Sequence, residues 1–348
     1  RVFAQQGGVF ELDLGVTSVL IVADADAAEA VFVTRARNYD KGGEFWDGAR
    51  EQAGQGLTQS EGELWRRQRR LMQPKFQREA IESYHSLIDS TIRDAIDRLP
   101  VEVPIDLGKW CEDLLVVLSL RVLLGSELDA AAIEQVRHAM DVRLDALLRG
   151  VVLRKLPRWL PQPGRARLAH ANATIETTLS KLIARVRERG PGNDLLSALL
   201  IATDEEGTMS DAQLRDEAVV IFGAGFETTA STLAWTLWLL ATHEHVLADV
   251  QRELDAGADE RPLLRACVHE ALRLYPPGAL IPRRAVADDE LGGYAVRAGT
   301  SVIVVEQDIV QALQVADRVY CFQEGRLSLS GRPRELSREQ IHHAYFGS

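Results

Sequence analysis

A single charged residue lies at the centre of an otherwise apolar segment that runs from Ala218 to Thr242. The sequence there is AVVIFGAGFETTASTLAWTLWLLAT, in which Glu227 and Thr228 follow Gly225 closely. A glycine next to two polar side chains could let such a helix open locally and admit a small ligand or water. The pattern predicts a proton-delivery groove beside a bound cofactor. A helix-packing site is the alternative, because a buried threonine often bonds back to the i−4 carbonyl.

A second segment places a glutamate and an arginine three residues apart. Glu270 and Arg273 would share one helix face, and the apolar residues around them indicate that the pair is at least partly buried. The alternative is a surface ion pair, which contributes little to stability. Pro276 and Pro277 are then expected to end the helix and to send the chain out extended.

The third feature is a basic run, WRRQRR, with an aromatic residue at its head. Trp65 and Arg69 are four residues apart, so on a helix they would project together and could bind one anionic group through indole and guanidinium N–H groups. The other arginines, Arg66, Arg67 and Arg70, are predicted to be solvated or to face an acidic partner. For an isolated run of this kind, a solvated helix face is the alternative.

Taken together and in this order, these features resemble the cytochrome P-450 family of haem-thiolate monooxygenases. The resemblance covers about residues 1–302 and includes a β-rich segment, Tyr275–Val302, after the ExxR helix. The matching motifs are WxxxR at Trp65 and Arg69, AGxETT at Ala224, Gly225, Glu227, Thr228 and Thr229, and ExxR at Glu270 and Arg273.

The resemblance implies a haem cofactor and gives the first motif its role. Trp65 and Arg69 would bind one haem propionate. Arg283 would bind the second propionate, with the adjacent Arg284 as the alternative.

The resemblance assigns roles to the other two motifs as well. Ala224 and Gly225 would lie against the cofactor, while Glu227 and Thr228 would relay protons so that the O–O bond breaks heterolytically. Glu270 and Arg273 would be structural and would lock the core on the proximal side of the haem.

The thiolate-bearing loop of that family, FxxGxRxCxG, has no counterpart in this sequence. The thiolate pushes electron density into the iron and favours O–O cleavage, so no neighbouring residue replaces it by position alone. Cys111 and Cys267 fall inside predicted helices and are interpreted as buried small hydrophobes. Cys321 lacks the loop's glycines and its upstream phenylalanine, so it is not expected to bind iron, and no metal ligand is identified. The arginine-bearing segment that completes the ExxR network is missing too.

Residues 303–348 resemble a different family, the C-terminal end of ATP-binding subunits of branched-chain amino-acid ABC importers. The pattern indicates a strand, a helix over 308–316, a hairpin around Gly325 and Arg326, and a last helix from Arg338. No GxxxxGK[ST] loop occurs in the chain, so ATP is not expected as a cofactor. A junction near Val302–Val305 would join the two parts. A genomic deletion, an assembly error and a real fusion remain open as its origin.

We therefore predict a mainly α fold with small β-sheets. It is a truncated cytochrome P-450 fold over residues 1–302, followed by a short α/β C-terminal tail over 303–348. The expected elements are strands over 9–14 and 18–22, a short helix over 25–34, and long helices from 64 to about 245. Prolines or glycines break the helices at 100–104, 157–163 and 190–193.

Composition excludes several classes of protein. The 348 residues include 40 Lys+Arg and 51 Asp+Glu, a net charge of −11 that argues against nucleic-acid binding. Three cysteines favour a reducing, cytoplasmic setting, and the polar centre of 218–242 argues against a membrane span. A monomer is expected. The chain begins at Arg1 and not at a methionine, so the true N-terminus and any targeting segment could be missing.

Three functions follow from these patterns. The first is a haem monooxygenase by descent, which would insert oxygen from dioxygen into a lipophilic small molecule with electrons from a ferredoxin or flavoprotein. This chain is expected to be inactive without the cysteine loop, so its enzymatic activity stays open. The second is a non-catalytic remnant that binds haem or a hydrophobic ligand through Trp65, Arg69 and Arg283. The third is an ABC-transporter-associated module that acts through the tail. The stretches 45–58 and 144–160 would line the pocket.

Overall fold

A computed structural model of the chain describes residues 8–13, 18–124, 130–153, 164–190, 192, 194–204, 207–257, 261–305, 319–323, 326–331 and 340. The predicted helix over 308–316, the break at 157–163 and all but one residue of the last helix lie outside these ranges. Contacts divide the chain into two units. One contains residues 1–12, 19–40 and 279–348, and the other contains 13–18 and 41–278.

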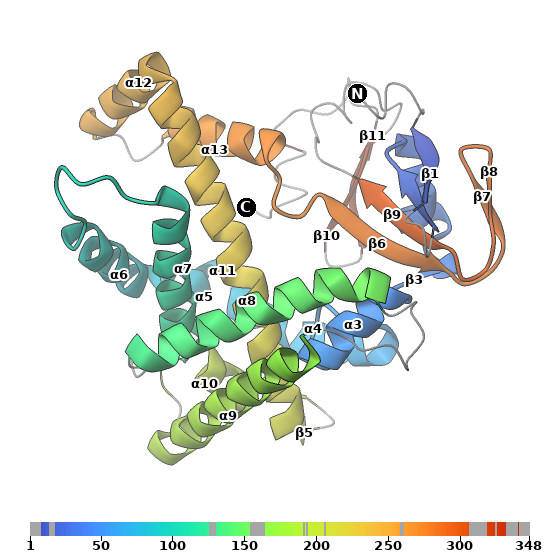
Figure 1. The fold of residues 1–348 in the computed structure, drawn as a ribbon, viewed down its shortest axis with the longest axis horizontal. Helices are drawn as coiled ribbons and strands as arrows, with labels where there is room; N and C mark the ends of the chain where they lie inside the picture. The colour runs from blue at the N-terminus through green and yellow to red at the C-terminus, as the bar shows by residue number, and fades with distance from the viewer. Residues whose placement is uncertain are drawn as a thin grey trace. The chain divides into compact units, whose positions relative to one another are not determined.

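A five-stranded sheet forms the centre of the first unit, with strand order β1-β2-β9-β6-β3 (Figure 1). Its strands are β1 (Val9–Asp13), β2 (Ser18–Val22), β3 (Tyr39–Asp40), β6 (Leu280–Ala285) and β9 (Ser301–Val305). β2 pairs parallel with β9, and β6 pairs antiparallel with β9, so segments almost 300 residues apart share one sheet. A parallel pair is covered on both faces, which explains why β2 is apolar along nearly its whole length. The strands predicted over 9–14 and 18–22 are confirmed as β1 and β2, and the strand indicated at the start of the tail is confirmed as β9.

The rest of this unit consists of short elements. The predicted helix over 25–34 is in two pieces, α2 (Ala25–Glu29) and a π-helical turn (Ala30–Thr34), with a 3-10 turn (Ala36–Asn38) after them. Strands β7 (Asp289–Leu291) and β8 (Tyr294–Val296) form one hairpin. Strands β10 (Val319–Gln323) and β11 (Arg326–Gly331) form another, which confirms the hairpin predicted around residue 325.

The second unit is helical, as predicted. Its elements are α3 (Glu44–Ala53), α4 (Gly62–Met72), a 3-10 turn (Gln73–Phe76), α5 (Arg78–Glu82), α6 (His85–Asp97), α7 (Leu107–Leu124), α8 (Ala130–Leu153), α9 (Arg165–Arg189), α10 (Leu195–Leu200), β4 (Thr203–Asp204), β5 (Gly207–Thr208), α11 (Asp211–Thr242), α12 (Glu244–Asp255) and α13 (Pro262–Leu274). The helix breaks predicted at 100–104 and 190–193 fall between α6 and α7 and between α9 and α10. α13 ends just before the double proline, as expected.

The long helix α11 organises the core of this unit. The Ser210 side chain caps its start by accepting from the Gln213 backbone N–H at 3.2 Å, while Gln213 Oε1 accepts from the Ser210 N–H at 3.0 Å. α7, α9 and α13 pack along α11 (Figure 1), and apolar residues of α4, α7, α8, α9, α10 and α11 form one continuous core. Within the described ranges, no helix has both the length and the hydropathy needed to cross a lipid bilayer.

Candidate active site

The helix α4 carries the predicted anion-binding pair and is fixed by one buried glutamine. Gln68 accepts a hydrogen bond from Ser60 Oγ at 2.5 Å and donates to the Gln55 carbonyl at 2.6 Å. Leu71 and Met72, on the same helix, are buried in the core. Trp65, three residues before Gln68, lies at the edge of this buried face and is half-buried, whereas Arg69 is turned further from it and is exposed.

The four arginines of α4 differ in whether their charge is compensated. Arg66 forms an ion pair with the exposed Glu63 on its own helix. Arg67 and Arg70 both bind Asp204 of β4, at 3.1 and 3.0 Å, so the predicted acidic partner exists. Arg69 is exposed, and its guanidinium has no hydrogen-bond or ion-pair partner among the residues that the structure describes. An uncompensated guanidinium four residues from a half-buried indole suits an anionic ligand.

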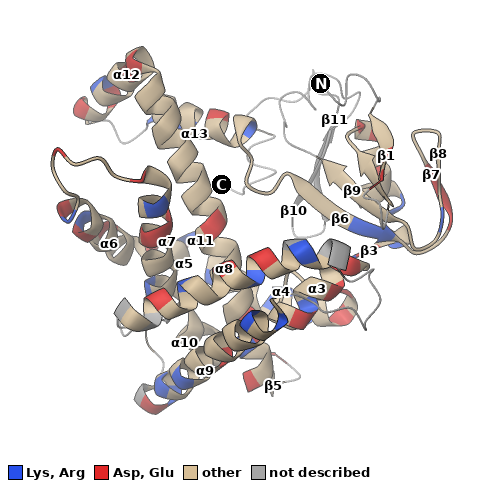
Figure 2. Ribbon diagram, viewed as in Figure 1, with Lys and Arg blue, Asp and Glu red and all other residues tan. Residues whose placement is uncertain are grey.

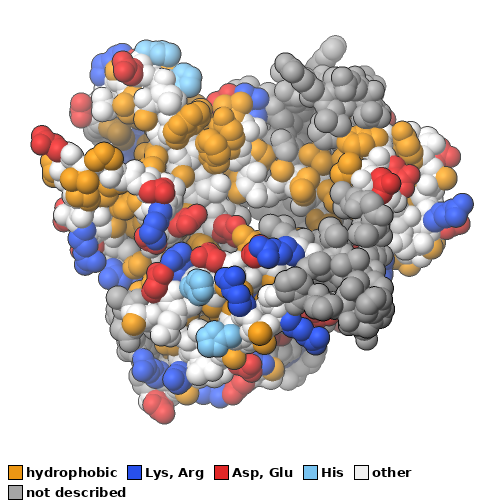
Figure 3. All heavy atoms as spheres, viewed as in Figure 1, with side chains coloured by type: hydrophobic (Ala, Val, Ile, Leu, Met, Phe, Trp, Pro, Cys, Tyr) orange, Lys and Arg blue, Asp and Glu red, His pale blue; other side chains and the backbone are white. Residues whose placement is uncertain are grey.

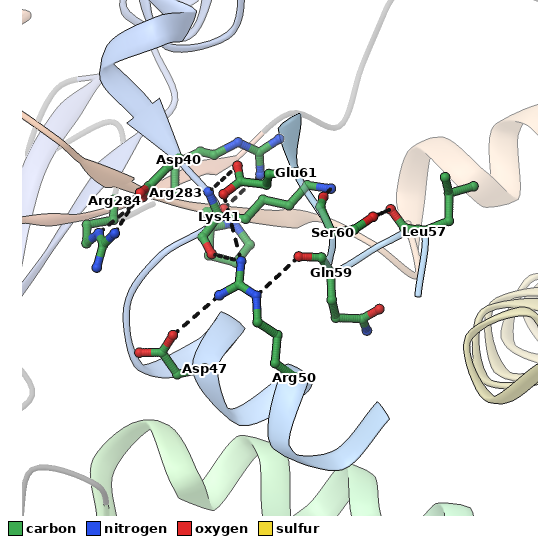
Figure 4. Close-up of polar contacts among 11 residues, drawn as sticks. Asp40, Lys41, Asp47, Arg50, Leu57, Gln59, Ser60, Glu61, Arg283 and Arg284 are labelled. Carbon is green, nitrogen blue, oxygen red and sulfur yellow. Dashed lines mark hydrogen bonds and ion pairs between the residues drawn. The ribbon is translucent and has the colours of Figure 1, made fainter. Parts of the chain in front are cut away.

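A second polar network, which the sequence reasoning missed, fixes the start of α4. Arg50 of α3 donates to the Lys41 carbonyl at 2.6 Å and to the Gln59 carbonyl at 3.3 Å (Figure 4). Lys41 in turn donates through its side chain to the Ser60 carbonyl at 3.0 Å, and through its backbone N–H to Glu61 at 2.8 Å. These contacts join α3 to the loop that enters α4. A sequence motif does not reveal them, because each uses a backbone group and joins residues 9–20 positions apart.

Arg283 and Arg284 are neighbours on β6, so their side chains point to opposite faces of the sheet. Arg284 binds the Asp40 carboxylate through two hydrogen bonds of 3.1 and 2.6 Å (Figure 4). The Arg283 guanidinium lies over the Phe32 ring at 5.2 Å and donates to the Pro282 carbonyl at 2.8 Å. Of the two alternatives for the second propionate ligand, Arg284 is held by a carboxylate. Arg283 stays the candidate.

The polar centre of α11 differs from the sequence expectation in two ways. The helix is continuous, because Thr228 donates to the Ala224 carbonyl and Thr229 to the Gly225 carbonyl, each at 2.8 Å. This is the back-bonding of the alternative interpretation, and no local opening is present. The helix is also not buried all round: Ala224, Gly225, Glu227 and Thr228 are exposed. Of these only Glu227 carries a charge, and it is the one charged residue after Glu217 on the helix (Figure 2).

Glu227 is the titratable group of this part of the helix. Its carboxyl has no hydrogen-bond partner among the described residues. Desolvation raises its pKa above the ordinary value, and the nearby carboxylates of Asp141 and Glu112 raise it further. A carboxyl with a raised pKa can take up and release a proton nearer neutrality than an ordinary glutamate.

The structure corrects the predicted burial of the ExxR pair. Arg273 binds Glu270 at 2.7 and 2.5 Å, but the two side chains are 37% and 51% exposed. The apolar residues around the pair do not bury it, because Ala271 on another side of α13 is the buried residue of this helix. The arginine hydrogen bond lowers the pKa of Glu270. The pair therefore matches the surface ion pair of the alternative interpretation.

Three aromatic rings join α13 to the end of α11 near this pair. Tyr275 stacks on Trp235 at a centroid distance of 3.8 Å, and Trp238 meets Trp235 edge-on at 5.5 Å. Both tryptophans stay partly exposed, and hydrophobic side chains gather where α11 and α13 lie (Figure 3). Aromatic pairs of this geometry stabilise the contact beyond their buried area.

The cysteines agree with the sequence expectation for two of three positions. Cys111 is buried in α7, and burial raises the pKa of its thiol to about 11. Cys267 is half-buried in α13, and its pKa is raised for the same reason. Neither thiol ionises readily at neutral pH. The backbone of Cys321 lies in β10 opposite Leu329. Among the described residues no group of His, Cys, Asp or Glu could hold a metal ion.

A cleft of about 590 Å³ lies between α3, α8 and α11. It is lined from both stretches that the sequence indicated, 45–58 and the described part of 144–160, and Ala224 and Glu227 reach it from α11. A Cβ at Gly223 of α11 would lie 2.9 Å from Met140 Cε of α8, so the end of that flexible side chain would have to move. The apolar lining residues are Phe45, Trp46, Ala49, Ala53, Met140, Leu144, Leu147, Val219, Val220 and Phe226.

One lining residue was missed at the sequence level. Arg143 of α8 reaches the cleft although only 4% of its surface is exposed. The signal that could have found it is the helical spacing, because Arg143 follows Val136 and Ala139 at the positions where a helix buries apolar side chains.

The family model for Cytochrome P450 matches residues 1–312 of this chain. The chain belongs to the cytochrome P450 family. It is 30% identical to pentalenene oxygenase of Streptomyces avermitilis over 332 residues, which cover 92% of the chain and 74% of that protein. It is 33% identical to cyclooctat-9-en-7-ol 5-monooxygenase of Streptomyces melanosporofaciens over 315 residues, covering 86% and 68%. The P450 match extends ten residues past the predicted limit at residue 302.

The fold agrees with the family as well. The chain superimposes on the crystal structure of the cytochrome P450DA heme domain with a TM-score of 0.72 at 22% identity, covering 86% of this chain and 69% of that one. The predicted P450 fold, mainly helical with small sheets, is thus confirmed. Membership of the family implies a haem cofactor, oxidoreductase chemistry of the monooxygenase type, a small-molecule substrate and redox partners.

The residues that the structure describes fit part of a haem site. The uncompensated Arg69 beside Trp65 suits a carboxylate of the cofactor. Ala224 and Gly225 present only a methyl group and a hydrogen on an exposed face of the P450 helix α11, which leaves room for a flat ring. The two cysteine side chains that the structure describes do not suit an iron ligand, because the raised pKa of each thiol disfavours the thiolate form.

Proposed function

We propose that this P450 chain binds haem and a lipophilic small molecule, as a monooxygenase by descent, and that it does not itself carry out thiolate-dependent oxygen insertion. The observation that carries the haem proposal is Arg69, the one arginine of the WRRQRR run whose charge no described residue compensates. The other three arginines of the run, Arg66, Arg67 and Arg70, each bind an acidic side chain. Only the position that binds a propionate in the family pattern, Arg69, has no acidic partner among the described residues.

Each site residue has a role in this proposal. Trp65 and Arg69 hold one propionate and Arg283 holds the other, while Ala224 and Gly225 lie against the ring. When bound, haem supplies the redox and oxygen-activating chemistry of the family. Glu227 exchanges protons with the cleft, as its raised pKa favours. Thr228 commits its hydroxyl proton to the Ala224 carbonyl, so it would have to leave that bond in order to donate. Glu270 and Arg273 stabilise α13.

The proposal of inactivity rests on the sequence. No FxxGxRxCxG segment is present, and Cys111 and Cys267 lie in helices with raised pKa values. Without a thiolate the push that favours O–O cleavage is lost. Electrons for an active relative would come from a ferredoxin or a flavoprotein. We further propose a monomeric, cytoplasmic protein.

The substrate class follows from the cleft and from the relatives. The cleft lining is largely apolar, which favours a lipophilic small molecule. Two relatives are named for oxidation of pentalenene and of cyclooctat-9-en-7-ol, both small organic molecules. A non-catalytic remnant that binds haem or such a ligand is the second candidate. A transporter-associated role of residues 303–348 stays a prediction from the tail sequence.

A haem titration tests the first part of the proposal. We expect the purified chain to take up haem with a Soret band, and Arg69→Ala to weaken uptake, while Arg66→Ala on the same helix leaves it unchanged. Equal uptake by both variants would show that Arg69 does not bind the cofactor.

The absorption spectrum of the reduced carbon monoxide complex tests the second part. We expect a histidine-like band or no complex. A red-shifted Soret band of the thiolate type would mean that a cysteine of this chain reaches the iron, and the proposal of inactivity would be wrong.

A further inference from the structure

One buried charge of the second unit has no counter-charge among the described residues. Arg143 lies on the interior face of α8 together with Val136 and Ala139, and only 4% of its surface is exposed. A helix position with this spacing normally carries an apolar side chain, and arginine is almost never fully buried unless it is paired. A guanidinium in this place therefore needs an explanation other than packing.

The described residues satisfy only part of the Arg143 guanidinium. One terminal nitrogen donates to the Gln52 carbonyl in the last turn of α3, and the other lies 3.9 Å from Met140 Sδ. The first contact is favourable, because the last carbonyls of a helix lack intrahelical partners and carry partial negative charge. A neutral carbonyl and a thioether nevertheless leave a full positive charge and several of its five donors without a match.

Four carboxylates line the cleft. Asp141 binds Arg137 at 3.1 Å and Asp145 binds Arg149 at 2.8 Å, whereas Glu112 and Glu227 have no hydrogen-bond partner among the described residues. No carboxylate of the described residues lies within ion-pair distance of Arg143. Desolvation alone acts on its pKa, lowering it to about 10, so the group stays cationic at neutral pH. The Arg143 guanidinium therefore lies at the wall of the cleft without an ion-pair partner among the described residues.

We propose that Arg143 binds the carboxylate of a lipophilic acid, such as a fatty acid, whose apolar body lies in the cleft between α3, α8 and α11. The inference rests on the proposed function, in that it takes this cleft as the substrate site of the P450. A guanidinium presents parallel N–H donors that match a carboxylate, and such charge-assisted pairs are stronger in a partly desolvated place. The cleft volume and its apolar lining suit an alkyl chain.

The alternative is a structural role, in which Arg143 only caps α3 through the Gln52 carbonyl. The two roles predict different behaviour toward ligands. A cap would stabilise the fold without changing the relative affinities of different ligands. A carboxylate anchor would give an acid a higher affinity than a neutral molecule of the same length.

The test compares dodecanoate with 1-dodecanol, both below their micellar concentrations, by isothermal titration calorimetry with the full chain at pH 8. We expect the chain to bind dodecanoate roughly tenfold or more tightly than the alcohol, as a charge-assisted pair implies. In Arg143→Met the two ligands should bind equally, and Arg143→Lys should keep a reduced preference because it retains the charge without the fork. Arg149→Met, an exposed cation of the same helix, is the matched control and should keep the full preference.

Two results would overturn the inference: equal affinity for acid and alcohol in the unsubstituted chain, or a preference that persists in Arg143→Met. Binding of neither ligand would overturn it as well. Thermal unfolding of each variant shows whether it is folded. If Arg143→Met does not fold, the affinities for acid and alcohol are compared between Arg143→Lys and the unsubstituted chain. Haem uptake is measured separately on the same proteins. A chain that prefers the acid but takes up no haem would refute the proposed function and leave the role of Arg143 standing.

Discussion

A buried carboxyl on α11, Glu217, should make the stability of this P450 fall as the pH rises. Its side chain is completely buried, one oxygen accepts a hydrogen bond from the Leu57 N–H at 2.9 Å, and the other has no partner among the described residues. Burial raises the pKa of Glu217 to about 7, the Leu57 bond opposes the rise, and the neighbouring Asp216 adds to it. The perturbation that isolates this effect is Glu217→Gln, which keeps an acceptor for Leu57 and removes the charge.

The sign and size follow from proton linkage. An unfolded glutamate titrates near 4.5, so between that pH and about 7 the folded chain holds a proton that the unfolded chain releases. The contribution of Glu217 is therefore most favourable below pH 4.5 and is lost as the pH rises through 7. A difference of 7 − 4.5 = 2.5 pKa units corresponds to about 3.5 kcal/mol over the whole titration, since each unit is worth about 1.4 kcal/mol.

Urea denaturation at pH 5 and pH 8 measures this contribution. Relative to the unsubstituted chain, Glu217→Gln should gain up to about 3 kcal/mol in the free energy of unfolding between the two pH values. Glu188→Gln, a change of an exposed carboxylate on α9, should show no such gain. The reasoning would be refuted if Glu217→Gln kept the pH dependence of the unsubstituted chain, or if it became relatively less stable at pH 8.

Two further predictions concern positions where the structure offers a matched control. Gly54 and Gly190 each end a helix with positive φ, but a Cβ at Gly54 would overlap the Asp216 carboxylate whereas one at Gly190 meets nothing within 4 Å. Gly54→Ala should therefore lower the melting temperature clearly more than Gly190→Ala, whose cost is about 1 kcal/mol from backbone strain alone, and equal losses would contradict the clash. Asp204→Asn should cost about 1–3 kcal/mol in urea denaturation, because it removes the negative charge that the largely buried Arg67 binds. Its control is Glu63→Gln on the exposed Arg66, for which we expect under about 0.5 kcal/mol, and a comparable loss there would show that the burial of Asp204 is unimportant.

The elements of this fold could be predicted from sequence wherever the cause is local. The capping residue at Ser210 and the double proline after α13 lie beside the helix ends that they set, and the strand at 301–305 follows from its β-branched residues. The hairpin at 319–331 agrees with the one that the tail pattern indicated around Gly325 and Arg326. In each case the residues that determine the backbone are within a few positions of it.

Burial and pairing could not be predicted, because they depend on residues far along the chain. The ExxR motif predicted the contact between Glu270 and Arg273, which are three residues apart, but it did not predict the exposure of the two side chains. The partner of Arg67 lies 137 residues away in a two-residue strand, and that of Arg284 lies 244 residues away. Arg143 was recognisable as a charge on an apolar stripe, yet its lack of a counter-charge appears only when α3 and α8 are placed together.

The residues proposed to bind haem and those proposed to bind the ligand lie on largely different elements of this P450. Trp65 and Arg69 come from α4, whereas Arg143 comes from α8 and is steadied by the end of α3. Only α11 belongs to both sets, because Ala224, which is proposed to lie against the haem, lines the cleft together with Glu227. No described contact of Arg143 involves a residue proposed to bind haem. For this reason the cofactor and the ligand are best tested by binding, each with its own variant, and not by turnover.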